Sequence, residues 1–272
     1  MDFTGVLLAG GKSTRFGINK IKIESEGIPL VVDQIVKLGF FCTEVLISSS
    51  SENSRYILQV IKKLENYKKT LLNSGSVKTR STSRSDNKIY NTPEPEWKDP
   101  IINIIIDDAE TRPDGKRIGP LAGIYSGLKE AKNNNCLVLA LDMPFVSFRV
   151  LRLLTRTSEM TGKDAVIIRN PKGIEALCGI YSRQYIKQIR DNIKNGIYKI
   201  SEVLGNLEVE WIDGTKLKEE RIDIYNFFNI NTADDIKRFN NIRMKEVPGV
   251  NPEKLNRRPC NIWKAFFYRG MD

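Results

Sequence analysis

The sequence predicts an α/β fold with three layers, in which a mainly parallel, twisted sheet carries helices on both faces. Three observations predict it. Short apolar runs alternate with helical patterns along most of the 272 residues, which is typical of a parallel sheet. The runs are almost continuously apolar, as expected of strands covered on both faces. Apolar residues make up 40% of the chain, enough for a substantial core.

The predicted strands lie at residues 5–9, 44–47, 101–106, 136–141, 165–168 and 176–180, with weaker candidates at 209–212 and 226–229. Segment 101–106 (IINIII) is so apolar that we expect a strongly buried strand.

The predicted helices lie at residues 29–38, 55–69, 120–132, 147–158, 184–195 and 232–240. Pro29 suits the first turn of its helix, and Ser147 and Thr232 suit N-caps. Gly196 marks the end of helix 184–195.

Two segments interrupt this alternation. Residues from about 73 to 100 are rich in Ser, Thr, Asn and Pro, and we interpret them as a flexible insertion. Residues 245–272 form a basic extension that ends in an aromatic cluster. It either docks on the domain through those aromatics or binds nucleic acid or another partner. We therefore expect one domain over residues 1–244 and an extension of unknown role.

Composition excludes several kinds of chemistry. The chain has no histidine, which excludes Ser-His-Asp and Cys-His triads and histidine-bound metals. Its four cysteines lie far apart in sequence, so we expect no disulfide framework and a cytoplasmic location. No apolar stretch approaches the roughly 20 residues of a membrane span, and we expect no membrane contact. The net charge of +10 fits anionic partners of several classes.

Residues 8–20, LAGGKSTRFGINK, follow the first predicted strand and have the composition of a phosphate loop. Gly10 and Gly11 let backbone amides approach a phosphate closely. Arg15 and Lys20 add positive charge. The loop is not a Walker-type P-loop, because that motif requires a glycine where Val6 stands. The dinucleotide pattern G-x-G-x-x-G is absent as well.

This segment resembles the signature of the molybdenum cofactor guanylyltransferase family of nucleotidyltransferases, L-A-G-G-x-S-x-R-M/F-G-x-x-K. The resemblance covers residues 3–240 apart from the insertion and implies a Rossmann-like nucleotidyltransferase fold. It implies that Leu8, Ala9, Gly10, Gly11 and Lys20 bind the nucleotide, and that Arg15 and Lys20 are catalytic.

Further nucleotide contacts follow from the same resemblance. Gly119 and Pro120 open a segment, GPLAGI, that is similar to the family's helix beside the nucleotide. An aspartate after strand 101–106 recognises guanine in the family. Asp107 and Asp108 both stand there, and we favour Asp108. Ser48 occupies the place of an asparagine that contacts the nucleotide in many relatives.

Asp142 ends the most hydrophobic strand, in a segment, LDMPF, that resembles the family's D-x-P-F/Y motif. A carboxylate there would be partly desolvated and costly without a partner. Mg²⁺ would supply one and would bridge the protein to phosphate oxygens. We therefore predict that Asp142 is both the metal ligand and a catalytic residue.

The second half of the family faces the acceptor. Residues 175–181 and 228–235 resemble its E-P-L-C-A-V-Y and F-x-N-I-N-T-P-E-D segments. Asn229 and Asn231 would contact the acceptor from one face of an extended segment. Alternatively, they cap the following helix.

The resemblance implies transfer of GMP from GTP to Mo-molybdopterin with Mg²⁺ as cofactor, with molybdoenzymes or other cofactor-biosynthesis proteins as further partners. Two alternatives stay open. One is the same chemistry with CTP or with another acceptor, such as a sugar phosphate or cobinamide phosphate. The other is a non-catalytic module that binds nucleotide or nucleic acid, which the intact loop and LDMPF segment disfavour.

Overall fold

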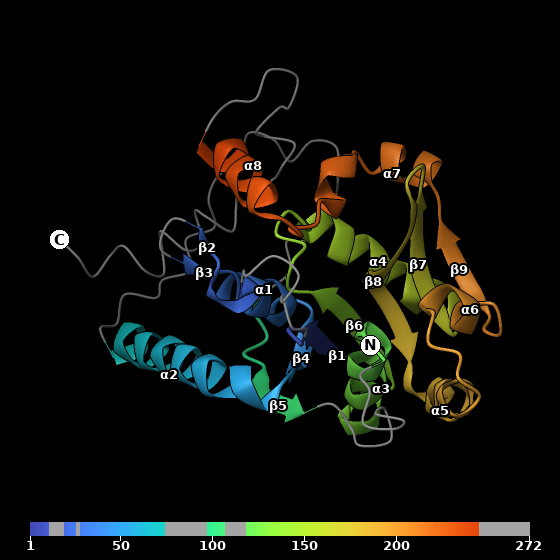
Figure 1. Ribbon diagram of the computed structural model, residues 1–272, viewed down its shortest axis with the longest axis horizontal. Coiled ribbons are helices and arrows are strands. Elements are labelled where there is room, and N and C mark those ends of the chain that lie inside the picture. The colour runs from blue at the N-terminus through green and yellow to red at the C-terminus, as the bar shows by residue number, and fades with distance from the viewer. Residues whose placement is uncertain (11–18, 26–27, 74–96, 107–117, 245–272) are drawn as a thin grey trace.

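The computed structural model describes residues 1–10, 19–25, 28–73, 97–106 and 118–244. Its main sheet has seven strands in the order β5-β4-β1-β6-β8-β7-β9 (Figure 1). Strand β8 is antiparallel to β6 and β7, and the other neighbours are parallel. The strands are β1 (Phe3–Leu8), β4 (Cys42–Ser49), β5 (Ile101–Ile106), β6 (Asn135–Ala140), β7 (Ala165–Asn170), β8 (Gly173–Ser182) and β9 (Val209–Ile212), and a separate hairpin pairs β2 (Glu24–Ser25) with β3 (Ile28–Pro29).

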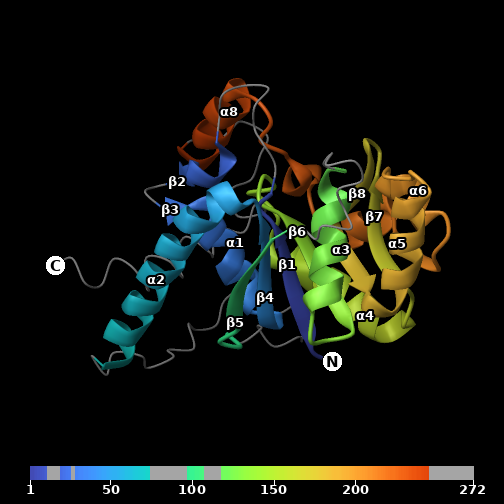
Figure 2. The same ribbon diagram turned by 60° about the horizontal axis from the view of Figure 1, so that its bottom comes forward.

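Helices cover both faces of this sheet, which confirms the predicted fold class (Figure 2). They are α1 (Leu30–Gly39), α2 (Ser51–Asn73), α3 (Pro120–Glu130), α4 (Phe148–Thr161), α5 (Ile186–Lys194), α6 (Ile200–Leu204), α7 (Gly214–Glu219) and α8 (Ala233–Met244). One face packs against α3, α5 and α6, and the other against α1, α2, α4, α7 and α8. Within the described ranges, no helix combines the length and the apolar character that a membrane span requires.

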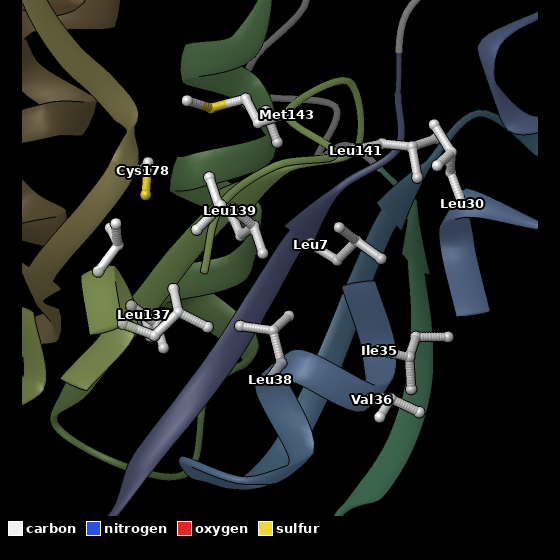
Figure 3. Close-up of a cluster of buried hydrophobic side chains, with 14 of the residues drawn as sticks. Leu7, Leu30, Ile35, Val36, Leu38, Leu137, Leu139, Leu141, Met143 and Cys178 are labelled. Carbon is white, nitrogen blue, oxygen red and sulfur yellow. The ribbon is translucent and has the colours of Figure 1, made fainter. Parts of the chain in front are cut away.

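The core on the α1 face is built from branched aliphatic side chains of helix and sheet (Figure 3). Leu30, Ile35 and Leu38 of α1 meet Leu7 of β1 and Leu139 of β6, and all five are fully buried. Figure 3 also shows Leu141 and Met143, which continue this core beyond the end of β6. The core therefore reaches the loop that carries Asp142.

Two predictions about strands were wrong. Segment 101–106 is a strand, but it lies at the edge of the sheet. Ile101 and Ile106 are 56% and 45% exposed, so it is not strongly buried. Segment 226–229 is not a strand, since residues Ile224–Phe227 form a 3-10 helix, η5, whose N-cap Asp223 accepts a hydrogen bond from the Tyr225 amide.

The helix boundaries differ from the predicted ones by small shifts. Helix α1 begins at Leu30 with Pro29 as its N-cap. Ser147 is the N-cap of α4 by its extended backbone, although its side chain makes no capping hydrogen bond. Gly196 follows α5 with a positive φ of 76°. Helix α2 runs to Asn73, so it is longer than predicted at both ends.

Most of the predicted insertion lies outside the described residues, but its last part is ordered against α1. The ring of Trp97 packs edge-on against Phe40, with ring centroids 5.5 Å apart. The Lys98 amide donates to the Gly39 carbonyl oxygen at 2.9 Å. A β-carbon on Gly39 would overlap the Trp97 ring, so a larger residue there would displace that ring.

Candidate active site

The carboxyl ends of four neighbouring strands lie level with one another. Leu8 of β1 is in register with Ser48 of β4 and with Ala140 of β6, and Ser48 is in register with Ile105 of β5. The predicted nucleotide loop, Asp107, Asp108 and Asp142 all follow these strand ends in sequence. Ligands of open α/β sheets bind at this edge.

Lys20 is held at this edge by a short helix and a buried anchor. It begins the 3-10 helix η1 (Lys20–Lys22), whose N-cap Asn19 accepts a hydrogen bond from the Ile21 amide. The Ile21 side chain is 1% exposed and packs into the core, which anchors the short helix beside Lys20.

The Lys20 ammonium joins two parts of the chain that are far apart in sequence. Its Nζ donates to Asp142 Oδ2 at 2.6 Å and to Asn231 Oδ1 at 2.9 Å. The Lys20 and Asp142 side chains are 26% and 21% exposed, so the ion pair is only partly open to solvent. A charge-assisted hydrogen bond this short is among the stronger polar contacts in a protein. The structure thus brings together a predicted catalytic lysine, the predicted metal ligand and a predicted acceptor residue.

Asp142 and the segment 229–231 are also joined through the backbone. The Ile230 amide donates to the Asp142 carbonyl oxygen at 2.9 Å, and Ile230 itself is 1% exposed. Asn231 is exposed and reaches Lys20. Asn229 instead donates through Nδ2 to the Phe227 carbonyl oxygen at 3.2 Å. The two asparagines therefore differ in their contacts, and a role of Asn229 toward an acceptor remains a prediction.

Helix α3 begins at the same edge. Its N-cap Gly119 has φ 77° and ψ −152°, a conformation that side-chain-bearing residues avoid. Gly119 and Pro120 are exposed, so the amino end of α3, which favours anions, is accessible. One turn later, a β-carbon on Gly123 would lie 2.7 Å from Ser48 Oγ and 2.8 Å from Leu8 Cδ2. The glycine thus allows α3 to press directly on the ends of β1 and β4.

Ser48 is buried at the end of β4, and its predicted contact with the nucleotide stays a prediction. Its exposed fraction is 1%, and its hydroxyl lies under α3 beside Gly123. Leu8 and Ala9 are also buried, and the Ala9 amide donates to the Ser48 carbonyl oxygen at 2.9 Å. Gly10 is the first exposed residue of the loop. Gly11, Arg15, Asp107 and Asp108 lie outside the described residues, so their predicted roles stay predictions.

One group of polar residues near the site was not predicted. Gln34 Nε2 donates to the Met143 carbonyl oxygen at 2.9 Å, and Lys37 Nζ donates to that of Pro144 at 2.7 Å. Both donors come from the buried face of α1. The available signal was an acid and a base four residues apart, Asp33 and Lys37, within a helix that is otherwise apolar apart from Gln34 and its terminal glycine.

A second unpredicted contact fixes Asn231. Asp235 Oδ2 accepts hydrogen bonds from the amides of Asn231 and Thr232, at 3.0 and 2.9 Å. In return, Thr232 Oγ1 accepts from the Asp235 amide at 3.1 Å. This reciprocal arrangement is a capping box, so Thr232 caps α8 as predicted while Asp235 holds the backbone of Asn231.

A family model described as the MobA-like NTP transferase domain matches residues 88–209. Just under half of the chain is therefore similar to this family. Several relatives by sequence are named as established or probable molybdenum cofactor guanylyltransferases. The molybdenum cofactor guanylyltransferase of Desulfosudis oleivorans is 30% identical over 120 residues, which is 44% of this MobA-like chain and 59% of that protein. The probable molybdenum cofactor guanylyltransferase of Nostoc is 26% identical over 237 residues, 86% of this chain and 89% of that protein.

Solved structures show the same resemblance. The crystal structure of molybdopterin-guanine dinucleotide biosynthesis protein A from Archaeoglobus fulgidus matches with a TM-score of 0.62 and 25% identity. The match covers 89% of this MobA-like chain and 99% of that chain. A nucleotidyl transferase from Methanothermobacter shares the fold with a TM-score of 0.56 at 14% identity. The MobA-like protein is therefore a nucleotidyltransferase.

The donor set fits a metal ion that arrives with a nucleotide. Within the described parts of the chain, no three Cys, Asp or Glu side chains are grouped so that they could hold a metal ion. Mg²⁺ often binds through only one or two protein carboxylates and takes its other ligands from substrate phosphates and water. Asp142 already holds one cation, the Lys20 ammonium. A single carboxylate in this position suits a shared protein–nucleotide site.

Proposed function

We propose that this MobA-like transferase transfers GMP from GTP to the phosphate of Mo-molybdopterin and forms molybdopterin guanine dinucleotide. The contact of Lys20 with both Asp142 and Asn231 carries the proposal. It joins a residue of the nucleotide loop to one of the acceptor half, so both substrates would meet at this point. The names of the relatives support GTP and molybdopterin as the substrates.

The reaction needs no histidine. The acceptor phosphate has a second pKa of about 6, so it is largely dianionic at neutral pH and is itself the nucleophile. Its oxygen bonds to the α-phosphorus of GTP while the bond from that phosphorus to the bridging oxygen of pyrophosphate breaks. No proton has to leave the nucleophile. The protein therefore contributes position and charge rather than a general base.

Each described residue has a definite part in this scheme. The Lys20 ammonium, which neutralises Asp142 in the free protein, would contact phosphate oxygens once the nucleotide is bound. The exposed amino end of α3 at Gly119 and Pro120 favours a second group of phosphate oxygens. Asn231 would orient the acceptor beside Lys20. When bound, Mg²⁺ held by Asp142 would supply charge neutralisation at the α-phosphate. Arg15 and Asp108 keep their proposed roles as a phosphate contact and a guanine contact.

The decisive experiment is incubation with α-labelled GTP, Mg²⁺ and molybdopterin, followed by identification of the product. We expect a labelled dinucleotide and one pyrophosphate per turnover. With CTP in place of GTP, we expect less than about one hundredth of that rate, because a site built to hydrogen-bond the edge of guanine rejects other bases strongly. A CTP-specific product, or a product only with a sugar phosphate, would replace the proposed substrates. Nucleotide binding without any transfer would favour a non-catalytic module.

The variant Asp142→Asn tests the metal role within that assay. We expect kcat to fall at least about a hundredfold, as for loss of a transition-state contact, while GTP affinity changes less than about fivefold. Asp191→Asn on α5 is the matched control, because Asp191 is 52% exposed on the opposite face of the sheet. Unchanged turnover in Asp142→Asn would remove the metal role.

Location and domain division complete the proposal. The thiols of Cys42, Cys136 and Cys178 are free and buried, and we propose the cytoplasm because its reducing conditions preserve free thiols. We also propose that residues 1–244 form the catalytic domain, with 245–272 as an extension.

A further inference from the structure

Helix α1 buries three polar side chains that the reaction described above does not use. Asp33, Gln34 and Lys37 are 3%, 0% and 2% exposed, in a helix whose other residues are apolar apart from the terminal glycine. Removing an ammonium group from water costs several kcal/mol unless it is paired and hydrogen-bonded. An apolar side chain of similar size would pack there without that cost. The role of these three side chains therefore depends on the groups that they contact.

The cluster holds the loop that directly follows Asp142. Lys37 Nζ lies 2.9 Å from Asp33 Oδ2 and donates to the Pro144 carbonyl oxygen at 2.7 Å. Gln34 Nε2 donates to the Met143 carbonyl oxygen at 2.9 Å. These two carbonyl groups lie one and two residues beyond Asp142.

The loop is tied on its other sides by backbone contacts. The Leu141 amide donates to the Leu8 carbonyl oxygen at 3.1 Å, and the Ile230 amide donates to that of Asp142 at 2.9 Å. Strand β1 and segment 229–231 thus fix residues 141 and 142, while α1 fixes residues 143 and 144. The α1 contacts differ from these, because they are made by side chains and one of them carries a charge.

We propose that Gln34 and Lys37 are positioning residues, which hold the Asp142 carboxylate where it can bind a divalent cation. The proposal rests on the metal role of Asp142 in the proposed function. Neither side chain touches Asp142 in the contacts described, so both act through the loop backbone. A displacement of about 1 Å at a reacting group can cost about a hundredfold in rate, and the 2.6 Å contact of Asp142 with Lys20 leaves little room for such a shift.

The test uses Lys37→Met, which keeps the aliphatic stem and removes the donor. We expect kcat to fall at least about tenfold with the GTP KM changed less than about threefold. In the full-length protein with a non-hydrolysable GTP analogue, we expect Mn²⁺ affinity, measured by electron paramagnetic resonance, to weaken by about the same factor. Gln34→Met should lower kcat and Mn²⁺ affinity by less, because the side-chain amide that it removes is an uncharged donor.

A second variant separates positioning from folding, since Lys37→Met leaves Asp33 buried without its cation. Asp33→Leu/Lys37→Met removes both charges, so its unfolding temperature should recover most of any loss. Its kcat and Mn²⁺ affinity should stay low, because the Pro144 carbonyl still has no donor. Recovery of both kcat and Mn²⁺ affinity to wild-type levels would overturn the proposal and show that the cluster serves folding alone.

The chain offers a matched control at the opposite end of the sheet. Glu44 is 3% exposed, and its Oε2 accepts hydrogen bonds from Thr4 Oγ1 at 3.0 Å and from the Lys132 amide at 3.1 Å. Glu44→Gln should therefore destabilise the protein without changing kcat or Mn²⁺ affinity of the folded fraction. Equal losses in Glu44→Gln and Lys37→Met would contradict positioning.

The two readouts keep this proposal separate from the proposed function. Mn²⁺ affinity requires no acceptor, so it reports on the loop even if molybdopterin is not the substrate. Absence of GMP transfer by the wild-type protein would overturn the proposed function alone. Unchanged Mn²⁺ affinity in Lys37→Met, with wild-type transfer intact, would overturn the positioning role alone.

Discussion

At the scale of single residues, Lys20 is the cation that contacts Asp142 within the described part of the chain. Its ammonium is 2.6 Å from Oδ2 of Asp142, the carboxylate that we propose for the metal. Two cations cannot share one carboxylate oxygen at contact distance without strong repulsion. Metal binding must therefore compete with Lys20 until a nucleotide offers the ammonium other oxygens. Such competition would couple the binding of metal and nucleotide.

This coupling predicts opposite effects of one substitution on two measurements. Lys20→Met should lower kcat by at least about a hundredfold. It should also strengthen Mn²⁺ binding without nucleotide by about tenfold, since a neighbouring unit charge is worth roughly 1 to 4 kcal/mol in such surroundings. Electron paramagnetic resonance titration of Mn²⁺ measures the second effect. Lys22→Met, two residues along η1 and exposed, should change neither quantity, and weaker Mn²⁺ binding by Lys20→Met would refute the competition.

Sequence reasoning selected Lys20 and Asp142 because each follows a predicted strand and matches a spaced motif. It did not select Gln34 and Lys37, because their importance lies in which carbonyl groups they meet. Those carbonyl groups belong to residues 109 and 107 positions away. The acid–base pair inside the apolar α1 was visible in the sequence, but its partners depended on how the helix docks.

At the scale of elements, apolar composition predicted the strands but not their order in the sheet. Segment IINIII is as apolar as β6, yet β5 is an edge strand and β6 is central. Composition cannot distinguish these places, because the order of strands follows from the crossover connections. Local turn chemistry also outweighed composition at residues 224–227, where Asp223 caps a 3-10 helix. The short helices α6 and α7 were not predicted, since five or six residues give no readable period.

The cap of α8 links helix stability to the site. Asp235→Ala removes the acceptor of the Asn231 and Thr232 amides, and loss of such a cap costs about 1 kcal/mol. We also expect kcat to fall severalfold, because Asn231 would no longer be fixed beside Lys20. Asp234→Ala is the control, since Asp234 is 78% exposed and pairs only with Lys237 in the contacts described. Equal effects of the two variants on kcat would contradict the link.

The same cap has a defined pH dependence. Partial burial opposes ionisation of Asp235, but hydrogen bonds from Asn231 and Thr232 outweigh it and lower the pKa of this carboxyl. A lowered pKa gives stability that is complete above the ordinary carboxyl pKa and is lost as the pH falls through the lowered value. Urea unfolding should therefore show the wild-type protein more stable than Asp235→Ala at pH 7, with the gap narrowing toward pH 3.

At the scale of the whole molecule, alternation of strands and helices predicted the layers and the edge where ligands bind. At that edge, Lys20 contacts Asp142 and Asn231, which lie 122 and 211 positions away from it in sequence. The sequence indicates which strand ends share an edge, but not which side chains touch across it. Those contacts depend on sheet order and on the path of residues 226–231, where one predicted strand was wrong. The roles of Asn229 and Ser48 therefore remain predictions.

Composition of the whole chain makes a last prediction about pH. The chain has no histidine, the one side chain whose ordinary pKa lies in the neutral range. Burial raises the pKa of the Cys136 thiol to about 12, and it also raises those of Cys42 and Cys178. None of these three thiols can then ionise near pH 7. The acceptor phosphate, with a second pKa of about 6, is left as the group that sets the pH profile.

At saturating Mg²⁺ and GTP, kcat/KM for the acceptor should therefore rise about tenfold from pH 5 to pH 7, as the dianion fraction does for a pKa of about 6. It should then stay level to pH 8 instead of forming a bell. Unfolding temperatures recorded at each pH show whether any fall reflects loss of structure. A falling limb between pH 6.5 and 8 in fully folded protein would reveal an essential acid on the protein, and the reaction without a proton-transfer group would be wrong.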